Sequence, residues 1–297
     1  MELEARQLHP FFVGEVDGGG LVVRDAVTRE QIEAIRAGMD RYAVLVFRNQ
    51  EITDEEQVAF AKRLDGELHA AAGQAALDRT AGKRRLPNSL VTDISNLDES
   101  SEIMESSDRR RMYALGNRLW HTDASFVAPA GRYSMLSAKT VPPVGGETEY
   151  VDERAAYDAL SDEMKTEIEG LRAHHSIVYS RSTIGFTAFT PEEEASLPGA
   201  DHPLVRTLPR SNRKTLYLAS HASHILGWPV PEGRLLLREL LEHATQTRFV
   251  YRHRWQVGDF VIWDNRCTMH RGRPFDEKTY RRDLHRVTTL DYEPVLA

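Results

Sequence analysis

The sequence predicts a mixed α/β fold with a β-barrel or jelly-roll core and flanking helices. Many short strand-like segments, a few amphipathic helices before and between them, and the absence of an internal repeat all favour this class. The chain has 297 residues, of which 41% are hydrophobic, enough for a substantial core. Because barrels of this size often fold as one unit, we expect residues 1–297 to form a single domain.

The N-terminal part predicts a helix, a strand and a second helix. The helices cover 28–42 and 53–64, and the apolar run at 43–47 between them is typical of a buried strand. Each helix opens with a threonine followed three residues later by Gln or Glu, a capping box formed by Thr28 with Gln31 and by Thr53 with Glu56.

Residues 70–112 have mixed charge and weak periodicity, which predicts a long and partly mobile loop. Two interpretations stay open for this segment. It is either a surface insertion or a lid that closes over a functional site, because long loops in compact enzymes often gate substrate.

The rest of the chain predicts mostly strands. A strand over 133–141 ends at the Pro-Pro-Val-Gly-Gly turn of 142–146, and further strands are expected at 204–208, 215–219, 249–253, 260–263 and 284–290. Helices are expected at 152–160, 161–171 and 232–244. The last of these is amphipathic, with an apolar side made of Leu235, Leu236, Leu240 and Leu241.

Composition excludes several classes of function. The net charge of −7 argues against a general nucleic-acid partner, which would need a cationic face. The single cysteine, Cys267, cannot form an internal disulfide, and this fits a reducing cytosol. The N-terminus lacks the apolar run of a secretory signal, and no segment is long and apolar enough to span a membrane. We therefore expect a cytoplasmic protein.

The candidate site begins with the triplet His121-Thr122-Asp123 and continues at His270. In an extended segment alternate side chains share a face, so His121 and Asp123 would point the same way. Two histidines and one carboxylate that converge are the ligand set of non-haem Fe(II) oxygenases. A chain with 12 histidines and 45 acidic residues contains such a triplet by chance, so the triplet alone proves little. Five other histidines are interpreted as ordinary loop or surface residues: His174, His175, His224, His243 and His253.

Near the C-terminus, alternation places Arg282, Leu284 and Arg286 on one face of a strand. If Leu284 faces the barrel interior, both arginines enter with it and require anions there. A carboxylate would match a guanidinium in a bidentate pair. The opposite orientation, with Arg281 and Asp283 inward, stays open from alternation alone.

Together these segments resemble one enzyme family, the taurine dioxygenase / 2,4-dichlorophenoxyacetate dioxygenase family of Fe(II)- and 2-oxoglutarate-dependent oxygenases. The resemblance covers nearly the whole chain and is greater toward the dichlorophenoxyacetate type. It is carried by the segments 120–123, 132–138, 145–149, 221–224, 242–246 and 263–266, with His270 and Arg286. It implies a double-stranded β-helix, that is, a jelly-roll core.

Residue by residue, the resemblance implies that His121, Asp123 and His270 bind Fe(II). Thr148 and Arg282 would hold the distal carboxylate of the co-substrate 2-oxoglutarate, and O2 would be the oxidant. Arg286 would lie near the other carboxylate and the anionic head of the substrate. An apparent extra residue before this strand leaves Arg281 as an alternative to Arg282.

The implied substrate is an aryloxyalkanoic acid of the phenoxy-herbicide type, hydroxylated next to its ether oxygen. Asn117 and His69 resemble substrate-contacting residues of the taurine enzyme, so an alkylsulfonate stays open as the alternative. A zinc hydrolase and a non-catalytic metal-binding module are further alternatives, since both could use two histidines and an aspartate. Phe126, Tyr179, Phe186 and Phe189 are candidates for an apolar wall. The resemblance also favours a homo-oligomer.

Overall fold

The computed structural model describes residues 3–16, 21–26, 28–69 and 84–292. Within these ranges, seven strands form the largest sheet, and they are antiparallel except where β2 pairs with β3. Their order across the sheet is β1 (Ala5–Gln7), β2 (Gly14–Val16), β3 (Val44–Phe47), β13 (Phe260–Asp264), β5 (Gly131–Thr140), β15 (Asp283–Leu290) and β4 (Thr92–Ser95).

A smaller antiparallel sheet faces the inner side of this large sheet. It consists of β12 (Val250–His253), β6 (Thr148–Asp152) and β14 (Thr268–Gly272). Leu136, Trp263 and Leu284 of the large sheet pack with Tyr150 of β6 in one buried cluster. The functional site described below lies at one end of this cluster.

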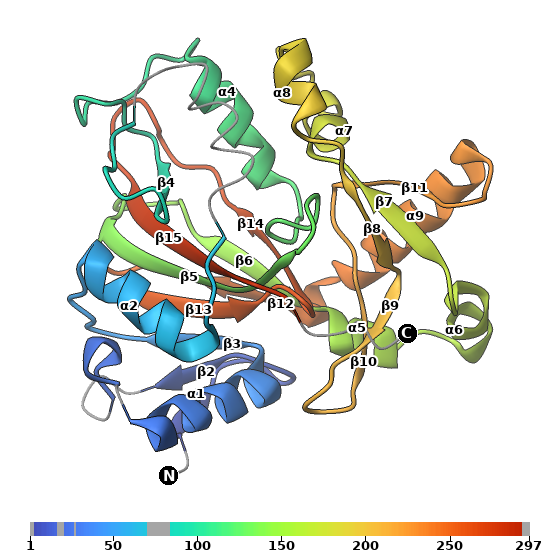
Figure 1. Cartoon of the computed structure of the whole chain (residues 1–297), viewed down its shortest axis with the longest axis horizontal. Helices are drawn as coiled ribbons and strands as arrows, with labels where there is room; N and C mark the ends of the chain where they lie inside the picture. Colours follow the sequence, from blue (N-terminus) through green and yellow to red (C-terminus); the bar gives the residue numbers. More distant parts are fainter. Residues whose placement is uncertain (1–2, 17–20, 27, 70–83, 293–297) are drawn as a thin grey trace.

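Helices cover the outer side of the large sheet (Figure 1). Residues of opposite parity on the same strands, such as Met135, Ile262 and Val287, point outward. They pack against α1 (Arg29–Tyr42) and α2 (Asp54–Asp65). Alternate residues of each strand therefore serve the two different cores. Both predicted capping boxes are present, one at the start of α1 and one at the start of α2, which confirms these two helices.

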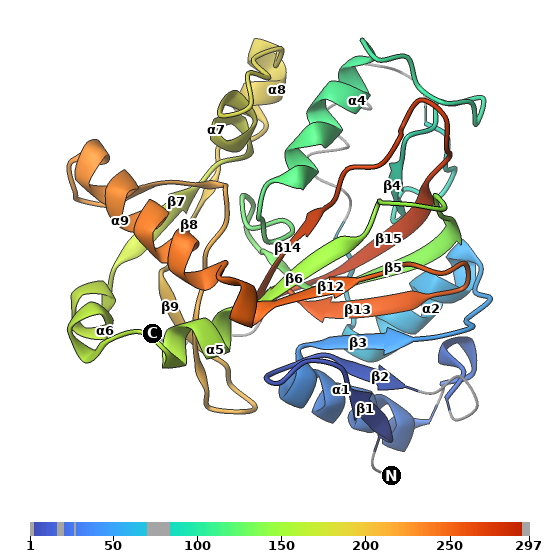
Figure 2. The same cartoon turned by 180° about the vertical axis from the view of Figure 1, so that it is seen from behind.

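A second lobe lies beside the two sheets and appears on opposite sides of Figures 1 and 2. It contains the sheet β11–β7–β8, the pair β10–β9 and the helices α5, α6 and α9, which share one apolar core. The bounds are α5 (Glu153–Asp158), α6 (Asp162–Ile168), β7 (Arg172–His175), β8 (Ala200–Pro203), β9 (Val205–Thr207), β10 (Lys214–Leu216), β11 (Ala222–Ile225) and α9 (Val230–Ala244).

Short helices complete the described part of the chain. They are η1 (Val23–Asp25), α4 (Arg109–Ala114), η2 (Leu115–Arg118), α7 (Ile177–Ser182), α8 (Pro191–Ala195) and η3 (Thr247–Phe249). Side chains from α4, α7 and the segment before β5 meet in a small apolar cluster that contains Tyr113, Phe126, Ile177 and Phe186.

Two sequence-based expectations need correction. The predicted loop 70–112 is not continuous, because 92–95 form strand β4 and residues from Arg109 onward form α4, while 70–83 lie outside the described residues. In α9 the buried face consists of Leu236, Leu237 and Leu240, whereas Leu235 is 67% exposed. At 100° per residue, Leu236, Leu237, Leu240 and Ala244 share one face of the helix, and Leu235 lies outside that face.

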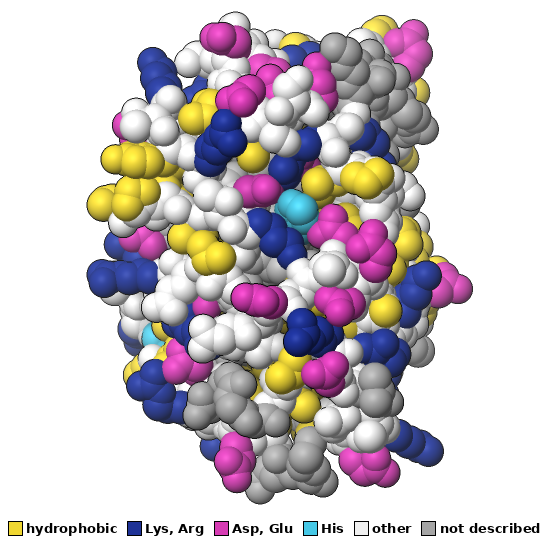
Figure 3. Space-filling model, turned by 90° about the vertical axis from the view of Figure 1, so that its left-hand side faces the viewer, with side chains coloured by type: hydrophobic (Ala, Val, Ile, Leu, Met, Phe, Trp, Pro, Cys, Tyr) yellow, Lys and Arg dark blue, Asp and Glu magenta, His cyan; other side chains and the backbone are white. Residues whose placement is uncertain are grey.

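The surface carries both signs of charge. On the face shown in Figure 3, Lys and Arg side chains are interspersed with Asp and Glu, without a large area of a single sign. In the described part of the chain, every helix is too short or too polar to cross a membrane.

Candidate metal and co-substrate site

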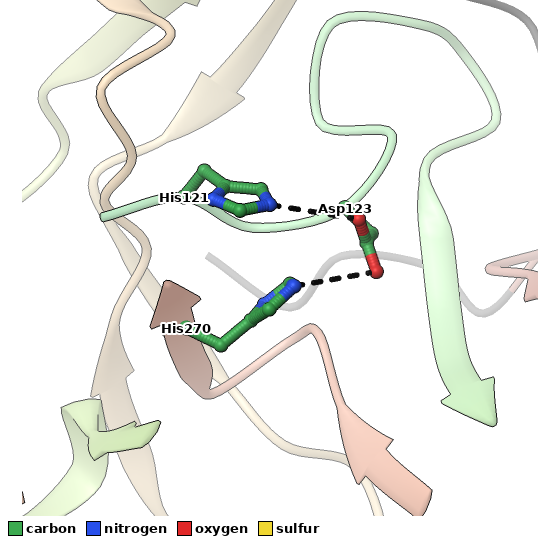
Figure 4. A group of neighbouring side chains, drawn as sticks. All are labelled: His121, Asp123 and His270. Carbon is green, nitrogen blue, oxygen red and sulfur yellow. Dashed lines mark ion pairs between the residues drawn. The ribbon is translucent and has the colours of Figure 1, made fainter. Parts of the chain in front are cut away.

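His121, Asp123 and His270 converge on one point (Figure 4). One potential ligand atom from each residue lies within 4.8 Å of those of the other two. The Nε2 atom of His121 is 3.9 Å from Asp123 Oδ1, and that of His270 is 3.8 Å from Asp123 Oδ2. All three side chains are at least 90% buried, so the point between them is shielded from bulk water.

Backbone hydrogen bonds hold the two histidines side by side. His121 and His270 form an isolated antiparallel bridge, in which each N–H donates to the carbonyl oxygen of the other at 3.0 and 2.8 Å. Their imidazole rings are 4.2 Å apart. His270 lies on β14, whereas Asp123 begins a turn, so the triplet is not the regular strand that alternation assumed.

The surroundings keep both imidazoles neutral, as metal ligands must be. Burial lowers the pKa of His121 to about 4 despite the nearby carboxylate, and burial also lowers the pKa of His270 well below its usual range. The Nδ1 atom of His121 lies 2.8 Å from the carbonyl oxygen of Leu119. Since a carbonyl can only accept, Nδ1 carries the proton and the lone pair of Nε2 points toward Asp123.

Asp123 is held ionised by the groups around it. Burial alone would raise its pKa, but the positive charge of Arg286 and the hydrogen bond from Ser134 hold it low, at about 2. The hydroxyl of Ser134 donates to Oδ2 at 2.7 Å, and Nη1 of Arg286 contacts Oδ1. Asn265 completes the support, because its side chain accepts from the Asp123 backbone N–H and donates to Ser134.

A cavity of about 140 Å³ opens beside His121 and His270. Thr148 and Arg282 line it, together with residues of β4 and α4. Within the described residues the guanidinium of Arg282 has no acidic partner. It donates only to the carbonyl oxygens of Gly146 and Ile94, at 3.1 and 3.5 Å. Burial lowers the pKa of Arg282 to about 10, the mark of a cation held away from water.

Gly146 allows this approach of Arg282. Its φ of +70° suits glycine, and a Cβ there would lie 3.3 Å from the Cδ and Nε atoms of Arg282. Arg281, the alternative anchor, points elsewhere: it is exposed and pairs with Glu102 at 2.7 Å. Of the two orientations that alternation left open, the structure has the one with Arg282 and Arg286 facing the cavity and Leu284 buried.

These residues fit the groups that the sequence implied. Two neutral imidazole nitrogens and one carboxylate, buried and convergent, form a donor set for Fe(II). The guanidinium of Arg282 and the hydroxyl of Thr148, which accepts from Trp255 Nε1 at 3.0 Å, offer a charged and a neutral partner for a carboxylate.

A second cavity of about 70 Å³ adjoins the first, shares Asn117, His121 and Arg286 with it, and is also lined by Asp123. His69 and Asn117, the candidate substrate residues, both line it, as do Phe126 and Arg286. Phe186 and Phe189 do not line this cavity, and their rings pack against Tyr113. Tyr179 does not line it either, and the guanidinium of Arg234 stacks on its ring.

Sequence reasoning missed several residues of this second cavity, among them Arg181 and His221. His221 is 1% exposed, and its ring lies 5.1 Å from that of Phe126. Arg181 comes from α7, a helix that the sequence pattern did not predict. Its neighbours in sequence give no periodic signal, so only the fold reveals its position.

Known proteins share this architecture. The model of the family described as "Taurine catabolism dioxygenase TauD, TfdA family" matches residues 4–288. The chain is 46% identical over 290 residues to an alpha-ketoglutarate-dependent 2,4-dichlorophenoxyacetate dioxygenase of Burkholderia sp. (strain RASC), covering 98% of this chain and 95% of that protein. It is 34% identical over 248 residues to an (S)-phenoxypropionate/alpha-ketoglutarate-dioxygenase of Sphingobium herbicidovorans, covering 82% and 80%.

A solved structure is similar over its full length. The crystal structure of AAD-2 in complex with Mn(II) and N-oxalylglycine superposes with a TM-score of 0.94, is 46% identical and covers 100% of both chains. At this similarity the arrangement of helices and sheets is shared throughout.

Proposed function

The chain belongs to the TauD/TfdA dioxygenase family, and from this premise we propose that it hydroxylates an aryloxyalkanoic acid next to the ether oxygen. The protein is a 2-oxoglutarate-dependent non-haem iron dioxygenase, with Fe(II) as cofactor and 2-oxoglutarate and O2 as co-substrates. The observation that carries the substrate class is the near-full-length similarity to a 2,4-dichlorophenoxyacetate dioxygenase.

In the proposed reaction, 2-oxoglutarate and O2 supply the electrons and the oxygen atom that the hydroxylation needs. Fe(II), when bound, couples the oxidation of 2-oxoglutarate by O2, to succinate and CO2, with the insertion of one oxygen atom into a C–H bond of the substrate. Hydroxylation beside the ether oxygen gives a hemiacetal or hemiketal. Its collapse releases a phenol and a small oxo acid.

In this proposal the protein supplies position and charge. His121, Asp123 and His270 would hold the metal, with Ser134 and Asn265 fixing the carboxylate of Asp123. Arg282 and Thr148 would bind the distal carboxylate of 2-oxoglutarate in the larger cavity. Arg286 borders both cavities and would neutralise negative charge between the co-substrate and the substrate.

The second cavity would receive the organic substrate. Its polar residues include His69 and Asn117, and its apolar wall includes Phe126 and Ile177. An aromatic ring could pack on this wall while its acidic group reaches the cationic side chains. These residue roles are proposals that mutagenesis can test.

Turnover assays test the function. The purified enzyme receives Fe(II), 2-oxoglutarate and O2 with 2,4-dichlorophenoxyacetate, each enantiomer of 2-phenoxypropionate, or taurine. We expect succinate and a phenol in equal amounts with at least one aryloxy acid. Succinate formation driven by taurine alone would contradict the proposal and favour the alkylsulfonate alternative.

We also propose features that go beyond the mixed α/β architecture. The two facing sheets would constitute a jelly-roll core. Residues 84–112, the described part of the expected loop 70–112, would cover the site within one oxygenase domain. The protein would work as a cytoplasmic homo-oligomer. Asp93 to Asn96 and Met104 line the larger cavity, which supports a covering role for this segment. Light scattering after size-exclusion chromatography would measure the oligomeric state.

A further inference from the structure

The second cavity contains a buried cation to which the proposed function assigns no role. Arg181 is 3% exposed and lines this cavity together with His121, Asp123 and Asn117. It comes from α7 and does not line the larger cavity, whose wall contains Arg282. The molecule therefore offers a cationic side chain beside each cavity.

The protein partners of Arg181 are all neutral. Its Nη2 donates to the Asn117 side-chain oxygen at 3.1 Å, its Nη1 contacts the Ser180 hydroxyl at 3.4 Å, and its guanidinium lies 4.5 Å from the centre of the Tyr113 ring. Its Nε is buried without a hydrogen-bond partner, and within the described residues no carboxylate pairs with it. A buried guanidinium in such surroundings is stabilised when an anion arrives.

The fold leaves room for this guanidinium. Gly116 lies directly against it, and a Cβ at that position would overlap the Cζ, Nη1 and Nε atoms of Arg181. Burial lowers the pKa of Arg181, although Tyr113 opposes the shift. The guanidinium thus occupies space that a side chain at position 116 would fill, and no negative charge of the described residues compensates it. This arrangement suits an anionic ligand.

The other arginine of this cavity is already engaged. Nη1 of Arg286 contacts the carboxylate of Asp123, one of the three residues of the triad. Asn117 accepts from Arg181 through its oxygen, and its amide nitrogen remains a donor that can point to the same ligand.

We propose that Arg181 and Asn117 form a subsite that binds the carboxylate of the organic substrate. The inference rests on the proposed function, since it names the group that recognises the acid. The aryl ring then lies on the apolar side of the cavity near Phe126 and Ile177. Arg181 binds the substrate and selects for acids, while Arg282 serves the co-substrate.

Binding measured without turnover tests the subsite. The protein is loaded with Mn(II) and N-oxalylglycine and titrated calorimetrically with 2,4-dichlorophenoxyacetate or with its uncharged amide. We expect Arg181→Met to raise Kd for the acid by about 100-fold and Kd for the amide by less than about threefold, because only the acid pairs with the guanidinium. Arg181→Lys, which keeps the charge but not the fork, should restore part of the affinity for the acid.

A matched control lies nearby. Arg234 also stacks on a tyrosine, 4.8 Å from the Tyr179 ring, and does not line either cavity, so Arg234→Met should leave both affinities unchanged. Affinity for N-oxalylglycine reports whether each variant retains a folded co-substrate site. If Arg181→Met destroys that site, Gly116→Ala provides the test, because it displaces the guanidinium without removing it. This variant should also lower the affinity for the acid and leave the affinity for the amide unchanged.

The outcomes separate the two proposals. A wild-type enzyme that neither binds nor oxidises any aryloxy acid contradicts the proposed function, and with it the aryloxy acid as the ligand of Arg181. The subsite alone is overturned if the wild-type enzyme binds the acid and both variants, Arg181→Met and Gly116→Ala, keep the same preference for acid over amide.

Discussion

At the scale of single residues, the carboxylate of Asp123 shows how the site is tuned. Both of its oxygens face imidazole nitrogens, and they also receive Ser134 and Arg286. Arg286 and Ser134 keep the group anionic despite burial, with a pKa of about 2. A ligand oriented by such neighbours loses little freedom when a metal binds.

Removal of the Ser134 hydroxyl should weaken the metal site without destroying it. We expect Ser134→Ala to reduce Fe(II) affinity by about 10- to 100-fold, since groups that orient metal ligands have effects of this size. Anaerobic titration with Fe(II) measures this change. Ser137→Ala is the control, because Ser137 lies on the same strand but donates to Gln57 on the helix side. Equal affinities in Ser134→Ala and the wild type would contradict the orienting role.

Neighbouring arginines provide a second test at this scale. Arg282→Met should raise the Kd for 2-oxoglutarate by about 100-fold, because it removes a charged hydrogen-bond partner from a desolvated site. Arg281→Met should change it little, since that exposed side chain pairs with Glu102. Anaerobic binding of 2-oxoglutarate to the Fe(II) protein gives both values. The reverse order of effects would show that Arg281 is the anchor.

At the scale of elements, β15 serves two functions through its two faces. Arg286 and the preceding Arg282 face the cavities, whereas Asp283 and His285 face outward to a cluster with Arg85 and Asp54. The outward cluster ties β15 to α2 and thereby fixes the strand that carries the cavity residues. Its ion pairs are shielded, since the His285 side chain is only 11% exposed.

This cluster predicts a pH-dependent contribution to stability. Burial alone would lower the pKa of His285, but Asp283 and Asp54 raise it to about 9. A raised pKa means that the stabilisation is complete below the unfolded-state value near 6.5 and is lost as pH rises through about 9. Between about pH 6 and pH 10 the wild type should lose roughly 3 kcal/mol more unfolding free energy than His285→Gln. Urea unfolding at both pH values measures the difference, and parallel losses in the two proteins would disprove the linkage.

How far the sequence predicts these elements depends on the range of the interactions that form them. Helices α1 and α2 were predictable because their capping boxes and apolar spacing are local. Strand β4 was not, because 92–95 have no alternation and become a strand only by pairing with β15. The triad residues and Arg282 could be named from motifs and parity, whereas Arg181 could not, since its burial results from contacts with η2.

At the scale of the whole molecule, the metal site joins distant parts of the chain. His121 and Asp123 precede the large central strand β5, and His270 lies on β14 of the opposite sheet. The three donor atoms therefore meet only when both sheets are assembled. In the unfolded chain these residues separate, and the affinity for metal is lost.

Metal binding should consequently stabilise the global fold. With Mn(II) at about 100 times its Kd, the free energy of unfolding should rise by about 2.7 kcal/mol in the wild type. Asp123→Asn should show little of this increase, because it lacks the anionic ligand. Denaturant unfolding with Mn(II) and with EDTA measures the increment in each protein. An equal increment in both would mean that the stabilising ion binds elsewhere.

The backbone bridge between His121 and His270 has a consequence for the evolution of specificity. The two imidazoles are paired through main-chain atoms, whose hydrogen bonds do not depend on the identity of the side chains around them. Substitutions in the wall of the smaller cavity, at positions such as Phe126 or Ile177, can therefore reshape the chamber while the oxidising centre keeps its geometry. Relatives that act on different acids could diverge by such changes, each retaining the same catalytic machinery.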